Sequence, residues 1–174
     1  MRDIVKMAVI LLIIGAVCGG LLAAVHGFTT PIIEEREHAR FVATLESFLP
    51  EVARYEEDVV DGESFYPCYD SAGNLIGVVG NVYASGYGGD IRYIIGVDSD
   101  GRILGVKIQE HGETPGIGDV ITKDFFEQMF VGLSVEDPIA VGSDVDIVSG
   151  ATFSSGGMIS SVRRVMNLIG ERYL

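Results

Sequence analysis

The stretch DVDIVSGATFSSGGMISSV, residues Asp144–Val162, decides which fold we expect around it. Its first apolar residues predict a short strand that ends at Val148, and Ser-Gly-Ala-Thr predicts a turn. From Ser155 onward, apolar residues recur at helical spacing, which predicts an amphipathic helix packed on a sheet. These residues are Met158, Val162, Val165, Met166 and Ile169. The pattern therefore places the hydroxyl of Thr152 at the mouth of a helix.

Two interpretations of Thr152 follow from the chemistry of a helix start. The first backbone N–H groups of a helix lack partners, and the helix dipole favours an anion there. Threonine at this position commonly caps the helix, with a contribution of about 1 kcal/mol. Alternatively, Thr152 carries an esterified phosphate, since the same field stabilises it and the small Gly150 and Ala151 leave room for a large group. The residues alone leave both interpretations open.

Two further loops are rich in glycine: GYGGD, Gly86–Asp90, and EHGETPGIGD, Glu110–Asp119. Neither is a phosphate-binding P-loop or a dinucleotide fingerprint, because the Gly-Lys-Ser/Thr ending and the G-x-G-x-x-G spacing are missing. Such loops can lay their backbone against a flat ring, although each alone more often forms a tight turn. Three such loops in one small domain indicate a ligand site.

An uncharged apolar run, MAVILLIIGAVCGGLLAAV, extends from Met7 to Val25. It nearly matches the ~30 Å hydrocarbon core of a bilayer, and it is too long for a typical signal-peptide core. We therefore expect one retained transmembrane helix in contact with membrane lipid. Arg2 and Lys6 precede the run and an acidic excess follows it, which predicts a cytoplasmic N-terminus and an extracytoplasmic domain.

After the span, the sequence alternates helical and strand patterns. Pro31 at a helix-start position predicts a second helix that Pro50 ends. Asp70 and Asp98 begin similar segments, DSAGNLIGV and DSDGRILGV, each of which predicts an Asp-initiated turn between two strands. The similarity is either an internal repeat or convergent turn chemistry. Thr122–Phe130 predicts a short capped helix. The expected fold class is α+β, with antiparallel hairpins and packed helices.

Composition and charge exclude several classes of function. Twenty-five acidic residues against 12 basic ones give a formal net charge of −13, which argues against a nucleic-acid surface. Neither of the two cysteines lies in a haem or iron–sulfur motif, and the three histidines are scattered, so we expect no metal site. Cys68, alone outside the span, is expected to be a buried and unreactive thiol. No acid–base pair or nucleophile for catalysis is evident.

DIVSGAT resembles the Asp-x-x-Ser/Thr-Gly-Ala-Thr signature of FMN-binding domains, and GYGG, ETPGIG and SGATFSS occur in that family's order. The family includes the G subunit of Rnf ferredoxin:NAD oxidoreductases and the C subunit of the related sodium-pumping NADH:quinone oxidoreductases. The resemblance covers essentially the whole chain, and the short length is more similar to the Rnf protein. Ile117 stands where the family often has leucine.

The resemblance implies that Thr152 carries FMN covalently through a phosphoester bond and is not itself a catalytic residue. A separate flavin transferase would recognise the stretch from Asp146 to Thr152. Other residues are implied to lie near the cofactor. These are Gly86, Tyr87, Glu113, Thr114, Pro115, Gly116, Gly118, Ser149, Gly150 and Ala151.

By the same resemblance, the chain is an electron-transfer subunit of an ion-translocating enzyme complex in the cell membrane. Electrons would pass between ferredoxin and NAD through iron–sulfur and flavin subunits, coupled to Na⁺ or H⁺ transport. The alternatives are the quinone-reducing relative, or an extracytoplasmic ligand-binding or adaptor domain without redox activity. We expect an anchor over residues 1–28, a membrane-proximal helical segment over 29–60 and the FMN-binding domain over 61–174.

Overall fold

The computed structural model describes residues 2–174, and it begins with one long helix, α1 (Arg2–Phe48). This helix is long and apolar enough to cross a membrane. The expected break at Pro31 is wrong, because Pro31 lies inside α1. Proline lacks the N–H that would bond to the carbonyl of Gly27, yet the helix continues past it. It ends two residues before Pro50, where we expected its end.

Contacts divide the chain into two compact units, Met1–Val42 and Ala43–Leu174. Residues 51–60 differ from the helical segment expected over 29–60, because they form two short strands, β1 (Arg54–Tyr55) and β2 (Asp58–Val60). Both strands pair with the next strand of the sheet, which explains their extended backbone. The division after residues 28 and 60 stays a prediction.

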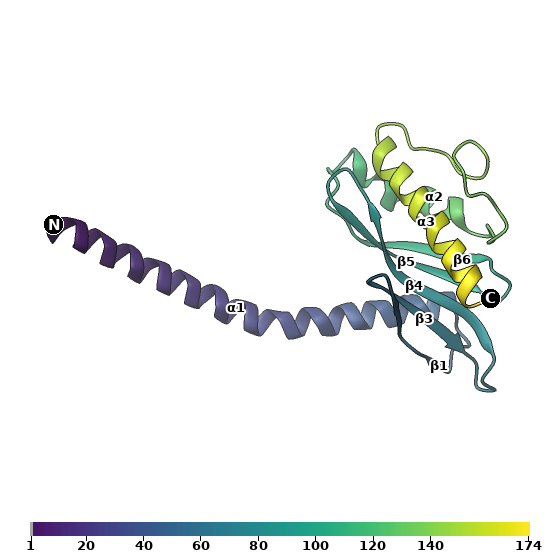
Figure 1. The fold of residues 1–174 in the computed structure, drawn as a ribbon, viewed down its shortest axis with the longest axis horizontal. Helices are drawn as coiled ribbons and strands as arrows, with labels where there is room; N and C mark the ends of the chain where they lie inside the picture. Colours follow the sequence, from purple (N-terminus) through teal and green to yellow (C-terminus); the bar gives the residue numbers. More distant parts are fainter. Residues whose placement is uncertain (1) are drawn as a thin grey trace. The chain divides into compact units, whose positions relative to one another are not determined.

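The sheet of the second unit consists of antiparallel pairs (Figure 1). Its order is β1-β3-β4-β5-β6, and β2 also pairs with β3. The long strands are β3 (Glu63–Tyr69), β4 (Leu75–Ser85), β5 (Asp90–Asp98) and β6 (Ile103–Glu110). The two expected strand–turn–strand segments are confirmed, and β4 pairs with β5 between them.

The turns that begin at Asp70 and Asp98 use the same hydrogen bonds. Asp70 Oδ1 accepts from the N–H groups of Ala72 and Asn74 at 2.8 and 2.9 Å. Asp98 Oδ1 accepts from the corresponding groups of Asp100 and Arg102 at 3.0 and 2.8 Å. The aspartate-initiated turns expected from the sequence are therefore confirmed, since each carboxylate satisfies two turn N–H groups.

The core lies between one face of the sheet and α3 (Thr152–Arg172), which is the last helix along the chain (Figure 1). The apolar residues expected to face the sheet are buried there: Met158, Val162, Val165, Met166 and Ile169. The segment between β6 and α3 holds η1 (Gly118–Thr122), α2 (Asp124–Glu127) and η2 (Gln128–Phe130). The cap expected at Thr122 is wrong, because Thr122 belongs to η1 and donates to the Asp119 carbonyl at 2.8 Å.

The end of α1 supplies apolar side chains to the second unit. The Phe48 ring lies where side chains on Gly96 of β5 and Gly105 of β6 would stand. Leu45, Leu49 and Cys68 are buried. Burial raises the pKa of the Cys68 thiol to about 12, so the expected unreactive thiol is confirmed.

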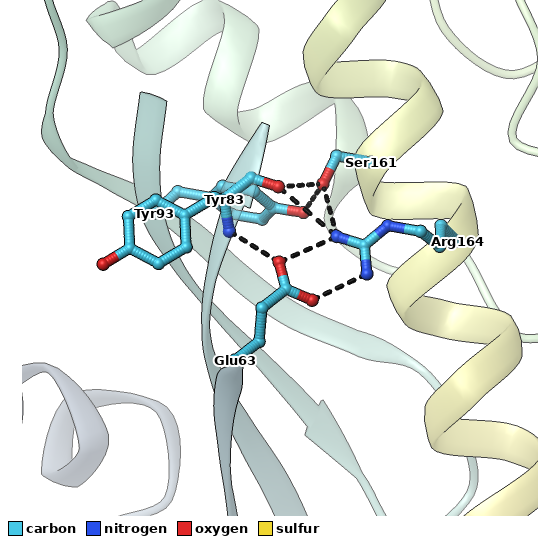
Figure 2. A network of polar contacts seen from close by, with 5 residues as sticks. All are labelled: Glu63, Tyr83, Tyr93, Ser161 and Arg164. Atoms are coloured by element: carbon cyan, nitrogen blue, oxygen red, sulfur yellow. Dashed lines mark hydrogen bonds and ion pairs between the residues drawn. The ribbon is translucent and has the colours of Figure 1, made fainter. Parts of the chain in front are cut away.

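A polar network fastens α3 to the sheet (Figure 2). Arg164 donates two hydrogen bonds to the Glu63 carboxylate, at 2.6 and 2.8 Å. Glu63 also accepts the Tyr83 N–H at 2.9 Å, and Ser161 donates to the Tyr83 carbonyl at 2.7 Å. The Tyr93 hydroxyl lies 2.9 Å from Ser161 Oγ. These contacts join α3 to β3, β4 and β5, and so they fix the helix that carries Thr152.

Two adjacent glycines of α3 make a matched pair for a stability test. A Cβ on Gly157 would overlap the Ser85 carbonyl oxygen of β4, whereas a Cβ on Gly156 meets nothing within 4 Å. We expect Gly157→Ala to lower the free energy of unfolding by about 1–3 kcal/mol, because β4 and α3 must separate. Gly156→Ala is expected to raise it by about 0.5–1 kcal/mol through helix propensity. Thermal unfolding of the full chain in detergent measures both, and equal effects would contradict the close approach.

Candidate functional site

The three glycine-containing loops meet at one cavity of about 210 Å³. It lies where the β4–β5 connection, the segment after β6 and the start of α3 come together. This convergence was expected from the sequence only as a shared ligand site, without its geometry. The lining residues are Tyr87, Glu113, Thr114, Ile117, Gly118, Gly150, Ala151, Thr152, Phe153 and Ser154.

The cavity includes most of the residues that the sequence nominated, but not all of them. Gly86, Pro115, Gly116 and Ser149 are not among its lining residues. Gly86 instead lies beneath it, because a Cβ there would collide with the Glu113 carboxylate. The sequence analysis did not nominate three further wall residues, which are Ile117, Phe153 and Ser154. The apolar residues within the two motifs were the available signal for Ile117 and Phe153.

Thr152 is the first residue of α3, and its side chain is exposed. The capping interpretation is wrong, because Ala151 occupies the N-cap and no side chain of residues 2–174 makes a cap hydrogen bond there. The first turn of α3 contains no acidic residue. Its leading N–H groups and the positive end of the helix dipole are therefore available to an anion.

The turn that leads into Thr152 is held by a buried serine. Ser155 Oγ accepts the Val148 N–H at 3.2 Å and donates to the Ala151 carbonyl at 2.8 Å. Gly150 has φ +87°, a conformation that side chains rarely adopt. The strand expected before this turn is wrong, because residues 144–148 form only an isolated bridge between Val141 and Val145. The turn is thus built by Ser155 and Gly150 rather than by a strand end.

The other two loops are locked together at their backbones. A Cβ on Gly88 would overlap the Gly112 carbonyl, and a Cβ on Gly112 would lie 2.5 Å from the Gly88 carbonyl oxygen. Glu113, only 6% exposed, accepts the Gly88 N–H through Oε1 at 3.2 Å. Glycines at these positions therefore allow two loops far apart in the sequence to share one wall of the cavity.

Exposed apolar side chains form the mouth of the cavity. The rings of Tyr87 and Phe153 meet edge to face, with centroids 6.3 Å apart. Together with Ile117 they are 79%, 62% and 58% exposed, respectively. Large apolar side chains held this far into water offer a surface to a flat apolar group.

Asp146 is exposed and borders a separate hollow with Met129, Gly142, Ser143 and Asp144. It is not a wall of the cavity at Thr152. Among residues 2–174, no group of three or more histidine, cysteine, aspartate or glutamate side chains is arranged to hold a metal ion. The role of Asp146 in modification stays a prediction.

Comparison with known families gives two matches along the chain. Residues 1–47 match the RnfG N-terminal region, and residues 86–167 match the FMN-binding domain, which includes all three loops. The RnfG protein of the ion-translocating oxidoreductase complex of Methanosarcina acetivorans is 30% identical over 182 residues, which cover 98% of this chain and 97% of that protein. The chain belongs to the RnfG family of ion-translocating oxidoreductase subunits. The N-terminal match favours this family over the quinone-reducing relative.

Other members of the RnfG family are similar over nearly their full length. The corresponding protein of Shewanella baltica is 28% identical over 188 residues, which cover 95% of this chain and 89% of that protein. The crystal structure of Shewanella oneidensis NqrC has a TM-score of 0.50 and 24% identity, covering 69% of this chain and 68% of that one. The latter likeness shows a shared fold. This RnfG family member is thus an electron-transport subunit with an FMN-binding domain.

Proposed function

We propose that this chain carries FMN covalently on Thr152 and relays electrons between ferredoxin and NAD, coupled to the translocation of Na⁺ or H⁺. One observation carries the proposal: the exposed hydroxyl of Thr152 stands at the uncapped start of α3, on the wall of the cavity formed by the three loops. FMN supplies the redox chemistry when it is bound, and the protein supplies attachment, orientation and electrostatics.

The residues of the cavity fit both ends of FMN. A phosphate on Thr152 Oγ1 would lie beside the leading N–H groups of α3, which favour an anion. Tyr87, Ile117 and Phe153 offer apolar surface to the flat ring, and Glu113 and Thr114 add polar groups. Attachment replaces the hydroxyl hydrogen of Thr152 with the flavin phosphate, so the chain gains the mass of FMN less one water. The tether would keep the cofactor from diffusing away outside the cytoplasm.

The assembly follows from the same proposal. A flavin transferase would modify Thr152 after recognising the exposed stretch from Asp146. The basic residues Arg2 and Lys6 favour a cytoplasmic start of α1, with residues 43–174 on the outer side of the cell membrane. The donor and acceptor of electrons would be iron–sulfur and flavin subunits of the same complex.

The attachment is tested on the chain purified from its own membranes. We expect the denatured protein band to fluoresce as flavin and to show the added mass of FMN less one water. A non-fluorescent band of unmodified mass, from cells that contain an active flavin transferase, would contradict the proposal. It would favour a ligand-binding or adaptor role.

The electron partners are tested with the purified complex in liposomes. We expect reduced ferredoxin to drive the reduction of NAD and the movement of Na⁺ or H⁺ across the bilayer. Ferredoxin-independent reduction of a quinone by NADH would instead assign the chain to the quinone-reducing class.

A further inference from the structure

The Glu113 carboxylate is a buried charge on the wall of the cavity at Thr152. Its side chain is 6% exposed and comes from the segment between β6 and η1. Among residues 2–174, no lysine, arginine or histidine forms an ion pair with it. A buried carboxylate without a cation is costly unless hydrogen-bond donors surround it.

The two oxygens of this carboxylate differ in their partners. Oε1 accepts the Gly88 N–H at 3.2 Å and so joins the loops. Oε2 lies against Gly118, close enough that a Cβ there would collide with it. Within the described part of the chain, no donor reaches Oε2. One acceptor at the cavity is therefore left for a ligand.

The ring of FMN offers a matching donor. Oxidised isoalloxazine has a single ring N–H, in its imide group, and the rest of its edge consists of acceptors and methyl groups. The apolar side chains of Tyr87, Ile117 and Phe153 line the same cavity and favour the ring there over the ribityl hydroxyls, which prefer water. Resting on the proposed function, we propose that Glu113 accepts a hydrogen bond from the flavin imide and, through its charge, lowers the reduction potential of the flavin.

The sign of the effect follows from the charge balance. Uptake of two electrons and one proton adds one negative charge to the ring. A carboxylate in a water-poor site repels that charge more strongly than an exposed one does. Replacing the carboxylate with an amide removes the repulsion, and so it makes reduction more favourable.

The test is a redox titration of the flavinylated full chain in detergent, with dithionite as reductant and mediator dyes. Glu113→Gln keeps an oxygen for the Gly88 N–H and loses the charge. We expect its two-electron reduction to become about tenfold more favourable, a shift of about 30 mV to more positive potential. Glu113→Asp, which retains a carboxylate, is expected to keep most of the original potential.

A matched control is Glu110→Gln, three residues away along the chain. The Glu110 side chain is 62% exposed and pairs with Arg92 at 3.3 Å, so solvent screens its charge. We expect no measurable shift of potential in this variant. An equal shift in Glu110→Gln and Glu113→Gln would show that net charge, rather than position, is responsible, and it would overturn the proposal.

The other outcomes are equally decisive. An unchanged potential in flavinylated Glu113→Gln, equal shifts in Glu113→Gln and Glu113→Asp, or loss of flavin from folded Glu113→Gln would each overturn the role of Glu113. These results leave the proposed function standing, because that function fails only if the unaltered chain carries no covalent flavin. The flavin content of the unaltered chain is measured before any titration.

Discussion

Replacing Thr152 with valine is expected to abolish covalent flavin while the protein still folds. Valine has nearly the shape of threonine but lacks the hydroxyl to which a phosphate could be joined. Because the Thr152 side chain is exposed and makes no cap bond within residues 2–174, we expect the free energy of unfolding to change by no more than about 0.5 kcal/mol. In-gel flavin fluorescence and circular dichroism of the variant, co-expressed with a flavin transferase, measure the two properties.

Thr114→Val is the matched control for this substitution. Thr114 is a second exposed threonine on the wall of the same cavity, but it lies in the segment after β6 rather than at a helix start. We expect this variant to keep its covalent flavin. Fluorescence retained in Thr152→Val, or lost equally in both variants, would show that the attachment site lies elsewhere.

Replacing Glu63 with alanine is expected to lower the free energy of unfolding by about 2–3 kcal/mol. The substitution leaves Arg164 without its two hydrogen bonds and the Tyr83 N–H without an acceptor. Breaking a buried pair by removing one partner typically costs about 3–5 kcal/mol, and the Arg164 side chain is 47% exposed, so water offsets part of that cost. Denaturant unfolding of the full chain in detergent measures the change.

An exposed ion pair on the same sheet provides the comparison. Arg54 and Glu56 lie 3.3 Å apart, with side chains 65% and 58% exposed. We expect Glu56→Ala to change the free energy of unfolding by less than about 1 kcal/mol, because surface pairs contribute little. Equal losses for the two glutamates would mean that the network in Figure 2 does not fasten α3 to the sheet.

Local features were predictable from the sequence because their causes lie within a few residues. The aspartate turns at Asp70 and Asp98 form with side chains two to four residues away, and the apolar spacing from Met158 to Ile169 places one face of α3 on the sheet. Thr152 at a helix start was predicted for the same reason. Its misassigned capping role arose because the turn is satisfied by Ser155, which lies inside the helix.

Long-range pairings could not be predicted from local patterns. Glu63 and Arg164 are 101 residues apart, and nothing in either surrounding sequence indicates the other. Glu113 and Gly88 are separated by 25 residues, and their contact depends on how β5 and β6 bring the two loops together. The strand expected before Val148 failed because its apolar residues pack as an irregular segment with one isolated bridge.

The most direct measurement of the central claim is the mass of one tryptic peptide. Cleavage after Lys123 and Arg163 releases residues 124–163, in which Thr152 is the sole threonine. From native membranes, we expect this peptide to carry the mass of FMN less one water, with fragmentation placing the addition on Thr152. An unmodified peptide, recovered from cells with an active flavin transferase, would contradict the account.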